Sequence, residues 1–204
     1  MNRLIVLMFV LIPAFLFAQD QDKKINSFKE SVAAEKFRNY KDALDYLDDI
    51  KTEFKSDYLL NLRLGWLNYK LENYDTSVKY YQEAIRLSKN SPEALLGLTY
   101  PYSALGKWDE ISGIYKSILK QDKYNYSANL RLGQIYLNTG DYKNARIHLE
   151  RVYNNFRSDY EANLSLGWTY YYLGNKKQAR ELFVNAIIAS SGDENAEKGL
   201  ELTK

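Results

Sequence analysis

Apolar residues recur at alternating spacings of three and four along most of the chain, a pattern typical of helices with one buried face. In one stretch, Ala145, Leu149 and Val152 follow Tyr142 at such steps. The same face returns every 34 residues, which indicates that the chain is built from copies of one short repeat. The residues that open this face in successive copies are Tyr40, Tyr74, Trp108, Tyr142 and Lys176.

A second marker predicts another helix ahead of the first one in each repeat. Its pattern is Asn-Leu-x-Leu-Gly, and the intermediate copy, Leu95–Thr99, keeps both leucines but not the final glycine. Gly140 and Gly174 stand between the two helices of their repeats, where glycine accepts the positive φ of a tight turn. Each repeat is therefore predicted to be a helix, a turn and a second helix. The segments with the full pattern are Asn61–Gly65, Asn129–Gly133 and Asn163–Gly167.

This register divides the chain into an array. A lone pair of helices cannot bury its apolar face, so we expect each pair to be stabilised by stacking on its neighbours. Asp193 is a suitable N-cap for a short final helix that carries Ala196 and Leu200, which predicts a C-terminal capping segment over residues 192–204. The predicted fold class is all-α, an α-solenoid of five repeats over residues 24–57, 58–91, 92–125, 126–159 and 160–191.

The residues at these positions resemble the tetratricopeptide repeat family. Its pattern asks for adjacent Leu and Gly, a Tyr three residues later and then a Tyr-x-x-Ala step, which Leu132–Gly133, Tyr136 and Tyr142–Ala145 supply. The resemblance covers residues 24–191 and implies a right-handed superhelix whose first helices line a concave groove. The chain departs from the family where Asn replaces Trp before the Leu-Gly pair, and where the first repeat lacks that pair.

The family resemblance also implies which side chains face the groove. These lie at fixed offsets from the glycine of each first helix, and they are mostly apolar and aromatic, with two arginines beside them. Large side chains of an amphipathic helix or an extended peptide suit such a surface. Packing of Trp66 and Trp168 between helices is the alternative. The groove candidates are Leu62, Arg63, Trp66, Tyr69, Leu96, Tyr100, Leu130, Arg131, Gln134, Leu164, Trp168 and Tyr171.

The N-terminus has the organisation of a secretory signal peptide. Arg3 precedes an apolar run from Leu4 to Phe17, and Ala18 then precedes a polar stretch. We expect a signal peptide over residues 1–18, a short polar linker over residues 19–23, and secretion across the inner membrane into a bacterial periplasm. An uncleaved segment that anchors the chain in the membrane is the alternative. Because the chain has no Cys, its stability cannot depend on disulfides.

Composition argues against several other classes of function. The net charge of +2, from 28 basic and 26 acidic residues, provides no field that would attract nucleic acid. The one His and the absence of Cys argue against a metal site and a Cys nucleophile, and no glycine-rich phosphate loop is present. We therefore expect no cofactor and no catalytic residues.

The sequence thus favours a non-catalytic scaffold or adaptor outside the cytoplasm, with a protein or peptide partner, in envelope assembly or secretion. A structural subunit that self-assembles or docks into an envelope complex is the second hypothesis, with exposed tyrosines such as Tyr80, Tyr81 and Tyr153 as its contacts. An enzyme with an unrecognised site is the third. The sequence leaves the partner and the oligomeric state open.

Overall fold

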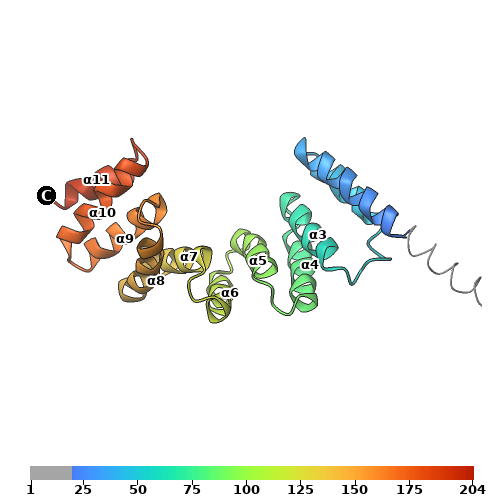
Figure 1. Ribbon diagram of the computed structural model, residues 1–204, viewed down its shortest axis with the longest axis horizontal. Coiled ribbons are helices and arrows are strands. Elements are labelled where there is room, and N and C mark those ends of the chain that lie inside the picture. Colours follow the sequence, from blue (N-terminus) through green and yellow to red (C-terminus); the bar gives the residue numbers. More distant parts are fainter. Residues whose placement is uncertain (1–19) are drawn as a thin grey trace, which may run out of the picture. The chain divides into compact units, whose positions relative to one another are not determined.

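The structure is a computed structural model that describes residues 20–204, in which every regular element is a helix (Figure 1). The all-α class that the periodicity predicts is confirmed. The predicted signal peptide, residues 1–18, lies outside the described residues. Among residues 20–204, no helix is both long enough and apolar enough to cross a membrane.

The helices follow one another in stacked pairs. From the second pair on, the first helices begin 34 residues apart, and the second helices begin at the markers that the sequence predicts. After a helix over residues 20–36, the elements are α2 (Tyr40–Asp48), α3 (Tyr58–Lys70), α4 (Tyr74–Leu87), α5 (Pro92–Ala104), α6 (Trp108–Gln121), α7 (Tyr126–Asn138), α8 (Tyr142–Asn155), α9 (Tyr160–Tyr172), α10 (Lys176–Ala189) and α11 (Glu194–Leu202).

These helices form two compact units. The N-terminal unit, described over residues 20–107, ends with α5, and the C-terminal unit, residues 108–204, begins with α6. The division therefore falls within the third sequence repeat. Each unit has its own core, built around Leu47 and Leu64 in the first and around Leu149 and Leu166 in the second. In the C-terminal unit, α11 packs against α9 and α10.

Of the linker expected over residues 19–23, the described residues 20–23 belong to the helix over residues 20–36. Polar composition alone does not end a helix, since Lys and Gln are good helix formers and neither Gly nor Pro occurs there. Lys23 also pairs with Glu53 at 2.9 Å, and Lys24 pairs with Asp57. Polar residues at this end of the chain therefore tie the first helix to the segment that follows α2.

The turn inside each pair places one residue in the left-handed conformation, at the same position of every repeat. Gly106, Gly140 and Gly174 have φ values of 69°, 80° and 81°, and Arg38 and Glu72 adopt a φ of 62° at the equivalent positions. A residue with a Cβ pays about 1 to 2 kcal/mol for this conformation. Packing of the flanking helices therefore fixes the turn even where glycine is missing.

In the N-terminal unit the ring of Tyr81, from α4, lies between the first helices of two successive repeats. A Cβ atom added to Gly65 of α3 would lie 2.9 Å from Tyr81 Cδ2, and one added to Gly97 of α5 would overlap Cε1 of the same ring. Tyr81 is only 3% exposed. The missing side chains of two glycines therefore make the space that this ring fills.

The C-terminal unit repeats the arrangement. The ring of Phe183, from α10, lies against Gly167 of α9 and Gly199 of α11, and Phe183 is fully buried. Leu149 of α8 occupies the equivalent position one repeat earlier and lies against Gly133 of α7. The sequence pattern identifies the glycine before each of these large residues, but the glycines that follow Tyr81 and Phe183 are visible only in the structure.

Buried asparagines explain the departure from the family pattern at the position before the Leu-Gly pair. Asn61, Asn129 and Asn163 are at most 4% exposed. The Nδ2 atom of each donates to two backbone carbonyl oxygens, one six residues earlier and one four residues earlier, at 2.7 to 3.0 Å. Each side chain thus satisfies carbonyls of the loop that connects one repeat to the next.

The asparagine oxygens differ between repeats. Asn129 Oδ1 lies 3.0 Å from His148 Nδ1, whereas Asn163 Oδ1 is buried without a hydrogen-bond partner among the described residues. Burial lowers the pKa of His148, and the nearby Arg151 and Lys116 lower it further. His148 is therefore neutral at neutral pH and serves as a structural partner of Asn129.

N-cap residues connect successive first helices. One oxygen of Asp159 accepts from the Ala162 backbone N–H at 2.8 Å, and the other accepts from the hydroxyl of Tyr126, one repeat earlier, at 2.7 Å. Asp193 does the same with Ala196 and Tyr160. Each carboxylate caps its own helix and holds the start of the preceding first helix, so a single side chain stabilises both local and inter-repeat structure.

We expect Gly97→Ala to destabilise the protein by about 1 to 3 kcal/mol, because the added methyl group overpacks the space filled by the Tyr81 ring. Gly113→Ala, in α6, is the matched control, since an added Cβ there meets no atom within 4 Å. Because alanine favours helix over glycine by about 1 kcal/mol, the control should be neutral or stabilising. Urea unfolding measures both, and equal free energies of unfolding for the two variants would contradict this packing.

Candidate functional site

The most apolar hollow in the described part of the chain is a groove of the N-terminal unit, which we call the aromatic groove. It is open along one side, has a volume of about 800 Å³ and lies across the helix over residues 20–36, α3 and α5. First helices therefore form its walls, while the Tyr81 ring from α4 contributes to its floor. It is lined by Phe28, Val32, Leu59, Leu62, Arg63, Trp66, Tyr81, Glu93, Leu96, Gly97 and Tyr100.

Most groove candidates of the N-terminal unit meet here. Leu62, Arg63 and Trp66 come from successive turns of α3, and Leu96 and Tyr100 come from the matching face of α5. The structure thus brings together the side chains that the 34-residue register places on equivalent faces.

Three aromatic rings form one cluster at an end of the aromatic groove. The ring centroid of Tyr69 lies 5.7 Å from that of Trp66 and 5.5 Å from that of Tyr100. Trp66 and Tyr100 are themselves 5.7 Å apart, in an edge-to-face arrangement. Tyr100 remains 49% exposed. The cluster therefore offers a preformed aromatic surface that costs little conformational entropy to cover.

Six lining residues were not among the groove candidates that the sequence provided: Phe28, Val32, Leu59, Tyr81, Glu93 and Gly97. Phe28 and Val32 lie 34 residues before Leu62 and Trp66, so the repeat register itself could have identified them. Glu93, in the first turn of α5, carries no apolar signal and accepts a hydrogen bond from the Tyr58 hydroxyl at 2.7 Å. The first repeat, which lacks the Leu-Gly pair, thus supplies a wall of the aromatic groove through Phe28 and Val32.

Glu35 organises the polar side of the aromatic groove. Its Oε1 atom accepts from Trp66 Nε1 at 2.6 Å, and its Oε2 atom lies 2.8 Å from Arg63 Nη1. Arg63 also donates from Nε to Ser31 Oγ at 2.9 Å, while its Nη2 atom is buried without a partner among the described residues. One carboxylate therefore fixes the orientation of the indole and the guanidinium together.

The indole of Trp66 both packs against the core and contributes to the surface of the aromatic groove. It lies in the groove lining and is partly buried against the core of the N-terminal unit. Lys70 Nζ lies 5.3 Å from the centre of its ring. The sequence left open whether Trp66 faces the groove or packs between helices. In the structure, part of the side chain lines the groove and part packs against the core.

In the C-terminal unit, the expectation that Leu130 lines a groove is wrong. Leu130 is 1% exposed and belongs to the hydrophobic core. Its neighbours at the surface are polar: Arg131 Nη1 lies 2.7 Å from Glu161, and Gln134 Nε2 donates to Ser165 Oγ at 3.2 Å. Polar bonds between α7 and α9 thus replace the apolar contacts found between α3 and α5.

The remaining candidates lie on α9. The ring of Trp168 is 5.1 Å from that of Phe183 and 5.7 Å from that of Tyr171, so the indole packs on the core ring of α10. It also lines a polar hollow of about 440 Å³, together with Tyr172 and residues of α7 and α11. Leu164 is partly buried.

Of the three tyrosines expected to mediate self-assembly, Tyr81 is buried, whereas Tyr80 and Tyr153 are partly buried. Tyr81 is 3% exposed and fills the space between two glycines. Tyr80 and Tyr153 are partly buried and pack against the cores of their units. Tyr81 lies two repeats, or 68 residues, before Leu149, so the 34-residue register itself places it on the buried face of its helix, and its assignment to the surface was wrong.

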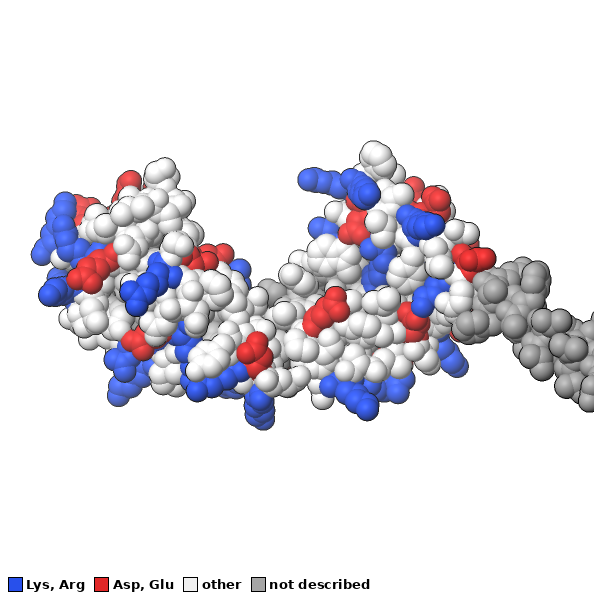
Figure 2. All heavy atoms as spheres, in the orientation of Figure 1, with Lys and Arg blue, Asp and Glu red and all other residues white. Residues whose placement is uncertain are grey.

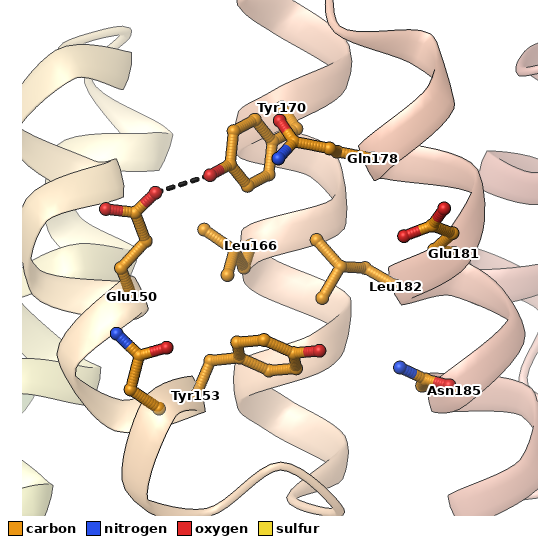
Figure 3. A pocket seen from close by; sticks show the side chains of 9 residues that line it. Glu150, Tyr153, Leu166, Tyr170, Gln178, Glu181, Leu182 and Asn185 are labelled. Atoms are coloured by element: carbon orange, nitrogen blue, oxygen red, sulfur yellow. Dashed lines mark hydrogen bonds between the residues drawn. The ribbon is translucent and has the colours of Figure 1, made fainter.

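A second, smaller pocket lies among α8, α9 and α10 (Figure 3). Its volume is about 370 Å³, and Glu150, Tyr170 and Glu181 are among the polar side chains around it. The Tyr170 hydroxyl donates to Glu150, as the dashed line in Figure 3 marks. Burial first, and then this carboxylate, raise the pKa of Tyr170 to about 12.

Within residues 20–204, no group of three or more His, Cys, Asp or Glu side chains is placed to hold a metal ion. Lys and Arg are scattered over the face seen in Figure 2, with Asp and Glu among them.

Comparison with known proteins identifies repeats of the same kind. Two family models described as tetratricopeptide repeat match the chain, one over residues 102–160 and 130–197 and the other over residues 59–91. Together they cover more than half of the 204 residues. The chain is 31% identical over 101 residues to a TPR repeat-containing protein of Methanocaldococcus jannaschii. That match takes in 50% of this chain but only 18% of the other protein, so the chain spans less than a fifth of its length.

Solved structures show the same architecture. A tetratricopeptide repeat protein from Parabacteroides merdae has a TM-score of 0.77 at 16% identity, with 89% of this chain and 72% of that chain covered. YrrB, a TPR protein with an unusual peptide-binding site, has a TM-score of 0.72 at 17% identity, with 92% and 98% covered. MamA has a TM-score of 0.71 at 14% identity, with 83% and 92% covered. At such identities, the likeness establishes the fold of stacked helix pairs.

We expect Glu35→Ala to cost about 1 to 3 kcal/mol of stability, because it leaves the Arg63 guanidinium and the Trp66 N–H without their shared acceptor. Glu83→Ala is the matched control, since Glu83 pairs with Arg86 on the surface of α4 and solvent-exposed pairs contribute little to stability. Urea unfolding gives both values. A cost for Glu35→Ala no larger than that of the control would contradict the organising role of Glu35.

Proposed function

Because the chain belongs to the tetratricopeptide repeat family, whose members are usually non-catalytic scaffolds for protein–protein interaction, we propose that it binds a segment of another protein in its aromatic groove. The observation that carries this proposal is the groove itself. Its walls are apolar over two successive repeats, and aromatic rings are already in place before any partner arrives.

The size and chemistry of the aromatic groove favour a helix or an extended peptide with large apolar side chains. Exposed apolar area at Leu59 (55%), Val32 (40%) and Tyr100 (49%) would be removed from water by such a segment. Burial of one large apolar side chain contributes about 1.5 to 3 kcal/mol. Two or three anchors are therefore enough to offset part of the cost of ordering a peptide.

We further propose that this binding takes place outside the cytoplasm, in envelope assembly or secretion within a bacterial periplasm. Support comes from the sequence of the N-terminus, where Arg3, the apolar run from Leu4 to Phe17 and Ala18 have the order of a secretory signal. The absence of Cys is compatible with either redox environment.

Site-specific photo-cross-linking in the native envelope fraction tests the proposed groove. A photoreactive phenylalanine analogue at Tyr100 should give a discrete adduct with a partner protein, whereas the same group at Tyr124, which is 62% exposed and outside the groove lining, should not. Leu59→Glu should abolish the adduct by placing a charge in the apolar wall. Ile25→Glu, at an apolar position of similar exposure outside the lining, should leave the adduct intact.

Equal adducts from both positions, or an adduct at Tyr100 that survives Leu59→Glu, would show that the partner does not occupy the aromatic groove. Circular dichroism of the Leu59→Glu protein verifies that loss of the adduct does not come from unfolding.

A further inference from the structure

The C-terminal unit carries a second elongated hollow, between two second helices. The pocket in Figure 3 and a neighbouring hollow of about 540 Å³ share Tyr153 of α8 and Asn185 of α10 in their linings. The two therefore form one continuous groove along α8 and α10, which we call the α8/α10 groove. Leu166 and Leu182 lie at the centre of the pocket drawn in Figure 3.

The two ends of the α8/α10 groove carry opposite charge. Glu150 and Glu181 line the first end, and Arg157 lines the other. Glu181 makes no hydrogen bond or ion pair with the rest of the described chain. The Cζ atom of Arg157 lies 5.8 Å from the centre of the Tyr153 ring. Tyr153 itself lies midway along the groove, because it lines both hollows. The charged side chains of the lining are therefore acidic at one end of the groove and basic at the other.

An apolar side chain stands exposed beside the basic end. Ile188 is 77% exposed and lines the same hollow as Arg157. It lies seven residues after Glu181 on α10, which is about two helical turns or roughly 10 Å along the axis. A helix that lay along the groove would present its own residues i and i+7 at the same spacing.

Two contacts within the unit position Glu150 at the first end of the groove. The Tyr170 hydroxyl donates to Oε1 of Glu150, and Arg146 Nε lies 4.0 Å from the same oxygen. Tyr170 remains protonated at neutral pH, because burial and the carboxylate raise its pKa. The Glu150 side chain is therefore held in place beside Glu181, which has no hydrogen bond or ion pair within the described chain.

We propose that the α8/α10 groove docks an amphipathic helix of a partner protein, with a Lys or Arg of that helix between Glu150 and Glu181 and a large apolar residue seven positions away on Ile188. An acidic residue at the far end of the partner helix meets Arg157. The opposite charges at the two ends define the direction of the partner helix, and the exposed isoleucine provides its apolar anchor. This surface is separate from the aromatic groove and does not depend on it.

The test uses two fluorescein-labelled helical peptides built on alanine and glutamine. Each peptide carries one Arg, a Leu seven positions from it and a Glu one turn beyond the Leu. In one peptide this order runs from the N-terminus to the C-terminus, and in the other it runs from the C-terminus to the N-terminus. Fluorescence anisotropy with the purified protein should show saturable binding of one direction only. Replacing the Arg of that peptide with norleucine should weaken binding roughly threefold to tenfold.

Variants of the protein then locate the bound peptide. Ile188→Ser should weaken binding about tenfold or more, from lost apolar burial, and Glu181→Gln roughly threefold to tenfold. Both residues are exposed, so the fold is retained. Ile147→Ser, at an apolar position that is 43% exposed and outside both linings, is the matched control and should have no effect.

Three results would overturn the proposal: no saturable binding of either peptide, equal affinity of both directions, or losses no greater than that of Ile147→Ser. A loss caused instead by Leu59→Glu would assign the peptides to the aromatic groove and would equally overturn it. Failure of this test leaves the aromatic groove of the N-terminal unit unaffected, because the two surfaces share no residue.

Discussion

A large ring from a second helix that fills the space left by two glycines is the contact on which the stacking of repeats depends. Tyr81 contacts Gly65 and Gly97, and Phe183 contacts Gly167 and the capping helix. In both cases the two glycines belong to successive first helices, so one ring fixes the separation of three helices at once. Because protein interiors are close-packed, any side chain at these glycines has to displace a ring that has nowhere to move.

The aromatic groove follows from this packing. Gly97 lies in the groove lining, and the Tyr81 ring beneath it closes the floor, so the contact that joins two repeats also shapes the surface above. Hydrogen bonds add specific contacts to the apolar packing of the helices. N-cap carboxylates such as Asp159 hold the preceding first helix, buried asparagines satisfy the connecting loops, and Glu35 orients Trp66. Scaffold and candidate binding surface are thus built from the same contacts.

Periodicity predicts those parts of the structure that repeat. The helix pairs, their starts and the groove positions on α3 and α5 follow from the 34-residue register, because burial of one helix face imposes it. Features that depend on one neighbour do not follow. Leu130 is buried because polar residues of α7 and α9 bond across the expected groove, and the Tyr81 ring fits against α5 because Gly97 has no side chain. Neither partner is marked by the repeat pattern.

The central claim is that the size of the ring and the absence of a side chain on the glycine are coupled. A double-mutant cycle on Phe183→Leu and Gly199→Ala, measured by urea unfolding, tests it most directly. Gly199→Ala should cost about 1 to 3 kcal/mol in the native background, because its methyl group overlaps the Phe183 ring. In the Phe183→Leu background, where the ring is gone, that cost should fall below about 0.5 kcal/mol. An equal cost in both backgrounds would contradict the account.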